Sequence, residues 1–185
     1  MTELSTTSIP GYVAGKWTID PVHTEIGFTV RHMMISKVRG RFKEFSGEIV
    51  TGENPADSSV TADIKTASFT TDNEQRDGHI KSADFLEAET WPDMTYRSTG
   101  VRSDGGDFFV DGELTLKGVT KSVPLKLELN GFGPDPYGGT RAGFTATGEI
   151  SRSEFNVSFN APMASGGVVV SDKVTLHLEI EAVKA

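Results

Sequence analysis

Strict alternation of apolar and polar residues is the feature that most constrains how this chain folds. In the stretch VTLHLEI, residues 174–180, each apolar residue is followed by a polar one. Successive side chains on a β-strand point to opposite faces, so this pattern predicts a strand with one buried and one solvated face. The pattern recurs at residues 26–30, 60–65, 123–129 and 144–150. The sequence therefore predicts an all-β protein.

One segment departs from this pattern. Residues 71–88, TDNEQRDGHIKSADFLEA, are typical of a short helical connection. Thr71 or Asp72 can cap its N-terminus, because their side-chain oxygens accept from the first free backbone N–H groups. Gly78 and Ser82 are expected to divide the segment into two short turns, since both are poor helix formers.

The strands must cover their own apolar faces, because one helix cannot cover them all. Residues 108–130 form a predicted hairpin whose turn is KGVTKS. Strands of this kind either pack as a sandwich or close into a barrel. We expect a single antiparallel barrel of about 8–10 strands with one short helical connection, since a barrel of this size can hold a small ligand.

Composition limits the function classes. The chain has 185 residues and 20 Gly, as expected for one turn-rich domain over residues 15–185 after a flexible lead-in over residues 1–14. A net charge of −8 disfavours nucleic-acid binding. The absence of Cys excludes disulfides, thiolate catalysis and Cys-based metal sites. The N-terminal residues lack the pattern of a secretory signal, so we expect a cytoplasmic protein.

Four ordered stretches carry a resemblance to a known family. They are WTIDPVHTEIGFTVRHMMISKVRGRFKEFSG (17–47), RDGHIKSADFLEAETWPDMTYRS (76–98), GELTLKGVTKSVPLKLEL (112–129) and ISRSEFNVSFN (150–160). With them the chain resembles the YceI-like family of polyisoprenoid-binding proteins. The resemblance implies a lipocalin-like antiparallel barrel with a long apolar cavity that takes isoprenoid chains or quinones. It also implies a homodimer, and many members are periplasmic, unlike the expectation for this sequence.

Inward-facing residues are the candidate ligand contacts. His32 shares the parity of Phe28 and Val30, so it is expected inside the barrel, where a buried imidazole needs a hydrogen-bond partner. That partner is either a backbone carbonyl or the polar head of a ligand. The wider set is read either as an ordinary filled core or as a lined cavity, and the resemblance favours the cavity. The candidate lining residues of the barrel interior and mouth, which include two methionines as flexible contacts, are Phe28, Val30, His32, Met33, Phe42, Ile64, Phe85, Leu114, Leu116, Phe144, Phe155, Phe159 and Met163.

Catalytic signatures are absent from the sequence, so we predict no catalytic residue, no metal site and no required cofactor. A bound isoprenoid lipid or quinone is compatible with the prediction that no cofactor is required. His23 and Glu25 are expected to form an outward surface pair. The alternatives are an enzyme that acts on such a lipid through His32, His79 or Asp84, and an interaction protein of stress response or respiration. For His79 and Asp84, a local network that holds the helix over the barrel mouth is favoured.

Positive charge is concentrated in one short segment. Arg31, Lys37, Arg39, Arg41 and Lys43 share one parity and are expected on the outer face. They form either an ordinary solvated strand face or a patch that meets an anionic membrane surface or a diphosphate head group. The predicted partners are therefore an amphiphilic lipid, a second copy of the chain and, peripherally, a membrane.

Overall fold

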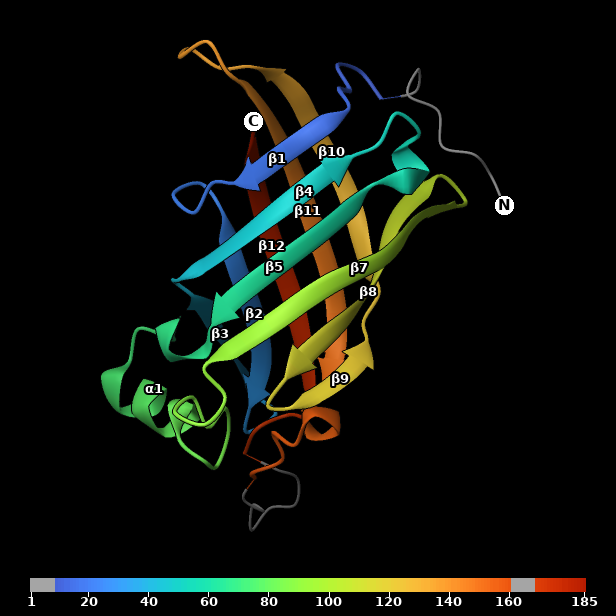
Figure 1. Cartoon of the computed structure of the whole chain (residues 1–185). Helices are drawn as coiled ribbons and strands as arrows, with labels where there is room; N and C mark the ends of the chain where they lie inside the picture. The colour runs from blue at the N-terminus through green and yellow to red at the C-terminus, as the bar shows by residue number, and fades with distance from the viewer. Residues whose placement is uncertain (1–8, 161–168) are drawn as a thin grey trace.

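The structure is a computed structural model that describes residues 9–160 and 169–185. Figure 1 shows long strands wrapped around one barrel, with a single α-helix beside its lower end. The helix α1 spans Glu74–Lys81, and short 3-10 turns lie at Pro55–Asp57, Thr66–Ser68 and Arg152–Phe155. The strands are β1 (Gly15–Ile19), β2 (Glu25–His32), β3 (Ser36–Phe42), β4 (Phe45–Thr51), β5 (Ser59–Lys65), β6 (Phe69–Thr70), β7 (Asp93–Asp104), β8 (Asp107–Leu116), β9 (Val119–Ser122), β10 (Leu125–Pro134), β11 (Thr140–Ser151) and β12 (Lys173–Lys184).

The barrel closes through β12. Neighbouring strands follow the order β1-β4-β5-β7-β8-β10-β11-β12, and β12 pairs again with β1. Strand β2 also pairs with β12, beyond β1: Ile19 lies opposite Ala182, whereas Ile26 lies opposite Leu178. Strands β1 and β2 thus share one position in the wall, and β4 and β3 share the next. The predicted lipocalin-like antiparallel barrel is confirmed.

Alternation sets which side chains face the interior. In β12, Leu178 lies opposite Ala146 of β11 and Ile26 of β2, and all three border the interior. The intervening residue His177 points the other way and pairs with Glu179 on the outside. The predicted parity of the last strand is therefore correct.

The hairpin predicted over residues 108–130 is present only in part, because residues 119–122 of its expected turn KGVTKS form strand β9. Strands β8 and β10 pair, with Leu125 opposite Val110. Between them β9 folds back along the end of β8 through a two-residue turn, in which Lys117 and Gly118 have φ angles of 50° and 77°. Positive φ at both positions is the geometry that a two-residue hairpin requires.

Neither predicted residue, Thr71 or Asp72, is the N-cap of helix α1. Asn73 is the N-cap, and its Oδ1 accepts a bond of 2.9 Å from the Arg76 N–H. Gly78 lies inside the helix without dividing it, so that expectation was wrong, whereas Ser82 caps the C-terminus. The buried Asp77 fixes the helix to the end of β6. Its carboxylate accepts from the Thr71 N–H at 2.7 Å and from the hydroxyls of Thr70 and Thr71. No helix among the described residues is long and apolar enough to cross a bilayer.

The described part of the N-terminal lead-in packs against the upper end of the barrel. Ile9 is buried, and the Tyr12 hydroxyl donates to the Gly52 carbonyl at 2.6 Å. Nearby, the fully buried Trp17 donates from Nε1 to Thr51 Oγ1 at 2.8 Å. This end of the barrel is therefore fastened by aromatic side chains with satisfied polar groups.

Candidate functional site: an apolar cavity inside the barrel

A cavity of about 470 Å³ lies inside the barrel. At its upper end it is bordered by Ile9, Tyr12 and Phe132, and at the α1 end by His79 and Val170. Between these ends the wall consists of aliphatic and aromatic side chains from the inner faces of the strands. The inward side chains do not fill the interior of the barrel. The interpretation as a lined cavity is therefore favoured over that of an ordinary filled core.

Most of the predicted lining residues border this cavity. They are Phe28, Val30, His32, Phe42, Ile64, Phe85, Leu114, Leu116, Phe144 and Phe159. Met33 does not, because β2 ends at His32 and Met33 belongs to an exposed turn. Phe155 does not either, because it lies on a 3-10 turn and is 1% exposed within the packed core. Met163 lies outside the described residues. Contact with a ligand stays a prediction for all of them.

Three aromatic rings meet on the β2–β3 side of the cavity. The ring of Phe28 stacks on that of Phe69 with centroids 5.1 Å apart, and Phe42 packs against both. Gly40 makes this possible, since a Cβ at that position would lie 2.4 Å from Phe28 Cζ. The glycine thus lets the ring lie against the β3 backbone.

His32 borders the cavity as its parity predicted. Its ring is half-buried and makes no hydrogen bond with any other residue that the structure describes. The backbone carbonyl that was one expected partner is therefore not found among those residues. The imidazole is left with capacity for a polar group that enters the cavity or for water.

His79 and Asp84 form the predicted local network at the α1 end. His79 Nε2 lies 2.8 Å from Asp84 Oδ2, and its ring meets the edges of Phe85 and Phe159 at centroid distances of 5.1 and 5.2 Å. Asp77 takes no part, because its carboxylate accepts from the hydroxyls of Thr70 and Thr71. The network fixes the helix to the apolar side chains at this end of the cavity.

Arg152 organises the same end and was missed by sequence reasoning. Its side chain is 5% exposed, and its guanidinium donates to the carbonyls of Val157 at 2.7 Å, Phe159 at 2.9 Å, Ser171 at 2.9 Å and Val170 at 3.2 Å. Burial lowers the pKa of this guanidinium, which stays protonated. No local pattern in the sequence marks an arginine that binds backbone carbonyls.

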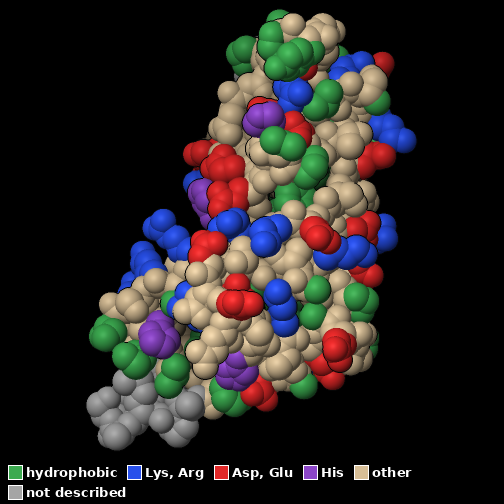
Figure 2. Space-filling model, turned by 90° about the vertical axis from the view of Figure 1, so that its left-hand side faces the viewer, with side chains coloured by type: hydrophobic (Ala, Val, Ile, Leu, Met, Phe, Trp, Pro, Cys, Tyr) green, Lys and Arg blue, Asp and Glu red, His purple; other side chains and the backbone are tan. Residues whose placement is uncertain are grey.

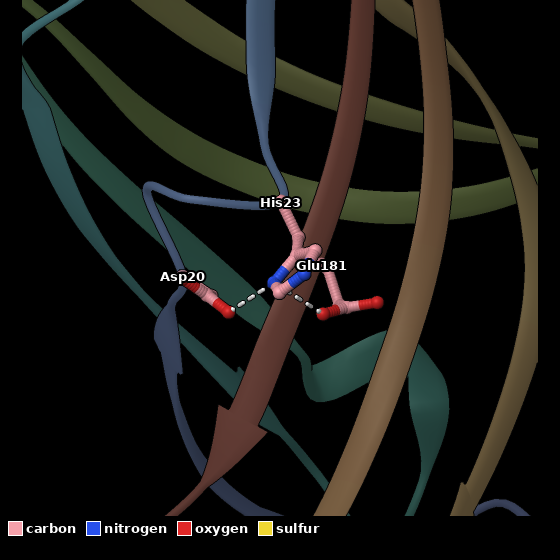
Figure 3. Close-up of side chains that lie close together, drawn as sticks. All are labelled: Asp20, His23 and Glu181. Atoms are coloured by element: carbon pink, nitrogen blue, oxygen red, sulfur yellow. Dashed lines mark hydrogen bonds and ion pairs between the residues drawn. The ribbon is translucent and has the colours of Figure 1, made fainter.

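A second polar cluster lies where β1 gives way to β2 (Figure 3). His23 Nδ1 lies 2.8 Å from Asp20 Oδ2 and 3.3 Å from Glu181 Oε2. His23 is exposed as predicted, but its partners are these two carboxylates rather than Glu25. The hydrogen bond from His23, followed by that from Arg141, lowers the pKa of Asp20 to about 2.

These three side chains come close enough together to hold a cation. However, Arg141 already donates to Asp20 Oδ2 at 2.8 Å, to Glu181 Oε2 at 2.7 Å and to Asp135 Oδ2 at 2.9 Å. The guanidinium supplies the positive charge that both carboxylates require, so the donor set does not call for a metal. The cluster instead ties the interrupted strand to β11 and β12.

Lys37, Arg39 and Arg41 lie on the outer face of β3, as predicted, and Lys43 directly follows the strand. Arg31 lies opposite Lys37, and Arg39 follows two residues later on β3. Arg41 pairs with Asp72 at 3.2 Å. Figure 2 shows Lys and Arg side chains gathered on this side of the molecule, above a group of hydrophobic side chains. Arg31 differs from the others, because it also borders the α1 end of the cavity.

Comparison with known proteins places the chain in a family. Residues 17–182 match the YceI-like domain. The chain belongs to the YceI-like family. Protein YceI from Escherichia coli is 40% identical over 175 residues, which cover 93% of this chain and 88% of that protein. UPF0312 protein plu2095 from Photorhabdus laumondii is 41% identical over 163 residues, or 88% of this chain and 82% of that protein.

Several solved structures share the barrel. The crystal structure of Campylobacter jejuni YCEI protein has a TM-score of 0.71 at 31% identity and covers 90% of this chain and 96% of its own. Burkholderia cenocepacia BcnA has a TM-score of 0.72 at 25% identity, with coverage of 88% and 98%. A polyisoprenoid binding domain from Saccharophagus degradans has a TM-score of 0.65 at 16% identity, with coverage of 94% and 100%, and shares the fold.

Proposed function

We propose that this YceI-like chain is a non-enzymatic protein that binds, stores or transports an isoprenoid-type lipid, such as a polyprenyl chain or an isoprenoid quinone. The observation that carries the proposal is the apolar cavity of about 470 Å³ enclosed by a closed barrel. Fold analogy with the polyisoprenoid binding domain of Saccharophagus degradans supports it further.

The free energy of such binding comes from apolar burial. Each buried CH2 group contributes about 0.8 kcal/mol, so a five-carbon isoprene unit gains roughly 3–4 kcal/mol before ordering and association costs are subtracted. Several units therefore bind without an ion pair. Since the wall is mostly apolar, chain length is selected by how many units the cavity accepts, and His32 and Arg31 at the α1 end are polar groups available to a head group.

The enzyme alternative has little support from the geometry. A general acid or base works best when a third group orients it toward the substrate. His79 has such a group in Asp84, but its half-exposed ring packs against the edges of Phe85 and Phe159, which suits a structural role. The ring of His32 has no orienting partner in residues 9–160 and 169–185.

Native mass spectrometry of protein purified without detergent tests the proposal. We expect a co-purifying isoprenoid lipid, or uptake of an added long-chain polyprenol. A protein that retains no lipid and takes up none would refute it.

Two neighbouring residues on β11 provide a matched pair of variants. Ala146 borders the cavity, whereas Thr147 points to the outer face. We expect Ala146→Trp to reduce the amount or length of bound lipid and Thr147→Trp to leave both unchanged. Should Ala146→Trp fail to fold, Ala62→Leu on β5 narrows the same cavity with a smaller side chain. Equal lipid content in the inward and outward variants would contradict the interior site.

A further inference from the structure

The turn between β2 and β3 breaks the usual rules of turn chemistry. Met33 and Met34 have φ angles of 51° and 62°, a left-handed conformation that costs free energy for residues other than Gly, Asn or Asp. Tight turns of this kind normally carry those small residues. Here Met33, Met34 and Ile35 are instead 36%, 53% and 78% exposed. Neither the backbone nor the core of the barrel explains three large apolar side chains at this position.

The strands that lead into the turn carry a second unfavourable feature. Arg31 lies directly opposite Lys37, and like charges at paired positions destabilise a sheet. Arg31, Lys37, Arg39 and Lys43 have no ion-pair partner among the described residues, although the whole chain has a net charge of −8. Residues 26–43 contain no acidic residue at all. An anionic partner would relieve this accumulated positive charge.

We propose that the β2–β3 turn docks on the surface of an anionic lipid bilayer. Met33, Met34 and Ile35 enter the boundary between head groups and acyl chains. The cations of Arg31, Lys37 and Arg39 contact anionic head groups. The surface of an anionic bilayer binds apolar side chains that are flanked by cations.

A second copy of the chain fits the turn less well. The outer edge of β3 has a strand partner only at Arg41 and Phe42, where β6 pairs with it in the described structure. Pairing of two such edges from identical chains would bring the cations at Lys37 and Arg39 together, and charged edge strands are a common means of preventing that contact. The charge on these strands therefore favours a bilayer.

The turn adjoins the α1 end of the cavity. The Met33 N–H donates to the Val169 carbonyl at 2.7 Å, and His32 pairs with Val170. Both His32 and Val170 border the cavity. Docking would hold this end of the cavity against the bilayer from which a lipid is drawn. The purpose of the docking therefore rests on the proposed function. The docking itself is measured independently of lipid retention.

Vesicle flotation of the full chain tests the charge requirement. The vesicles contain phosphatidylcholine with or without phosphatidylglycerol. We expect binding only with phosphatidylglycerol, and weaker binding as salt is raised. Each near-surface cation contributes about fivefold in affinity, so the double variant Lys37→Gln with Arg39→Gln should bind about 25-fold more weakly. Equal binding to both kinds of vesicle would overturn the proposal.

The apolar tip is tested by giving the turn its usual residues. The double variant Met33→Asn with Met34→Gly suits the observed φ angles, so we expect a higher melting temperature together with loss of vesicle binding. Loss of binding by a protein that is more stable separates docking from misfolding. The control is Tyr137→Ser, which removes an 86% exposed aromatic side chain from the β10–β11 turn at the opposite end of the barrel (Figure 1) and should bind as the wild type does.

Three results would overturn the docking. In the first, the tip variant floats as well as the wild type. In the second, Tyr137→Ser loses binding to the same extent, which means non-specific adsorption. In the third, the tip variant changes from dimer to monomer in size-exclusion chromatography, which assigns the turn to contact with a second copy. If the wild-type protein binds vesicles but carries no co-purifying lipid and takes up none, the result counts against the proposed function alone.

Discussion

Replacing Arg152 by Met should lower the free energy of unfolding by about 3 kcal/mol, because four backbone carbonyls lose a charged donor. The Val157 carbonyl is in a buried bond and loses about 2 kcal/mol, and the three part-buried carbonyls, which water can reach, lose about 1 kcal/mol each. Removing a buried guanidinium from the core returns about 2 kcal/mol. The difference between these contributions is the expected decrease of about 3 kcal/mol in the free energy of unfolding.

Thermal and urea unfolding measure this loss. For a chain of this size, about 3 kcal/mol corresponds to a decrease in melting temperature of roughly 6–12 °C. Arg152→Lys should fall between the wild type and Arg152→Met, since one ammonium cannot span four carbonyls. Arg97→Met, on the exposed face of β7, is the control and should change stability by less than about 0.5 kcal/mol. If Arg152→Met were as stable as this control, the role assigned to the guanidinium would be refuted.

Two further predictions concern other parts of the barrel. Gly40→Ala should destabilise the protein by about 1–3 kcal/mol in urea unfolding, because its Cβ would lie 2.4 Å from Phe28 Cζ. The control Gly133→Ala meets nothing within 4 Å and should be nearly neutral. Equal effects of the two variants would show that the Phe28 ring shifts freely. The pKa of Asp20 falls from 3.8 to about 2 on folding, so its stabilisation is complete above pH 3.8 and disappears as pH falls toward 2. The stability difference between wild type and Asp20→Asn should therefore shrink over that range, and a constant difference would contradict the assignment.

Alternation predicted most inner faces correctly, although register shifts within β7 and β10 change which parity faces the interior. Ile26, Phe28, Val30 and His32 all border the cavity as parity predicted, and at the end of β2 the outward-facing Arg31 borders it as well. Parity did not include Met33, which was expected to contact a ligand because its side chain is flexible; the chain turns there and exposes it. Parity also says nothing about a 3-10 turn, which is why the apolar Phe155 is buried without bordering the cavity.

Polar networks could not be predicted in the same way. Asp20 and Arg141 lie 121 residues apart, and only the closure of the barrel brings them together. The four acceptors of Arg152 are backbone carbonyls, which carry no signature in a sequence. His79 and Asp84 were found because they are five residues apart on one short connection. The sequence therefore predicts contacts that are local or periodic, and it misses those that depend on the closed barrel.

Closure through β12 constrains how the chain is made. Residues 173–184 pair with β11, β1 and β2, so the first and last strands must meet before the wall is complete. During synthesis every other strand leaves the ribosome earlier, with the edges of β1 and β11 still unpaired. Pairing over such sequence separations is slow, and open edges invite aggregation. A nascent chain therefore gains most from a chaperone shortly before β12 emerges, and stalled or truncated chains that lack β12 should be recovered in the insoluble fraction.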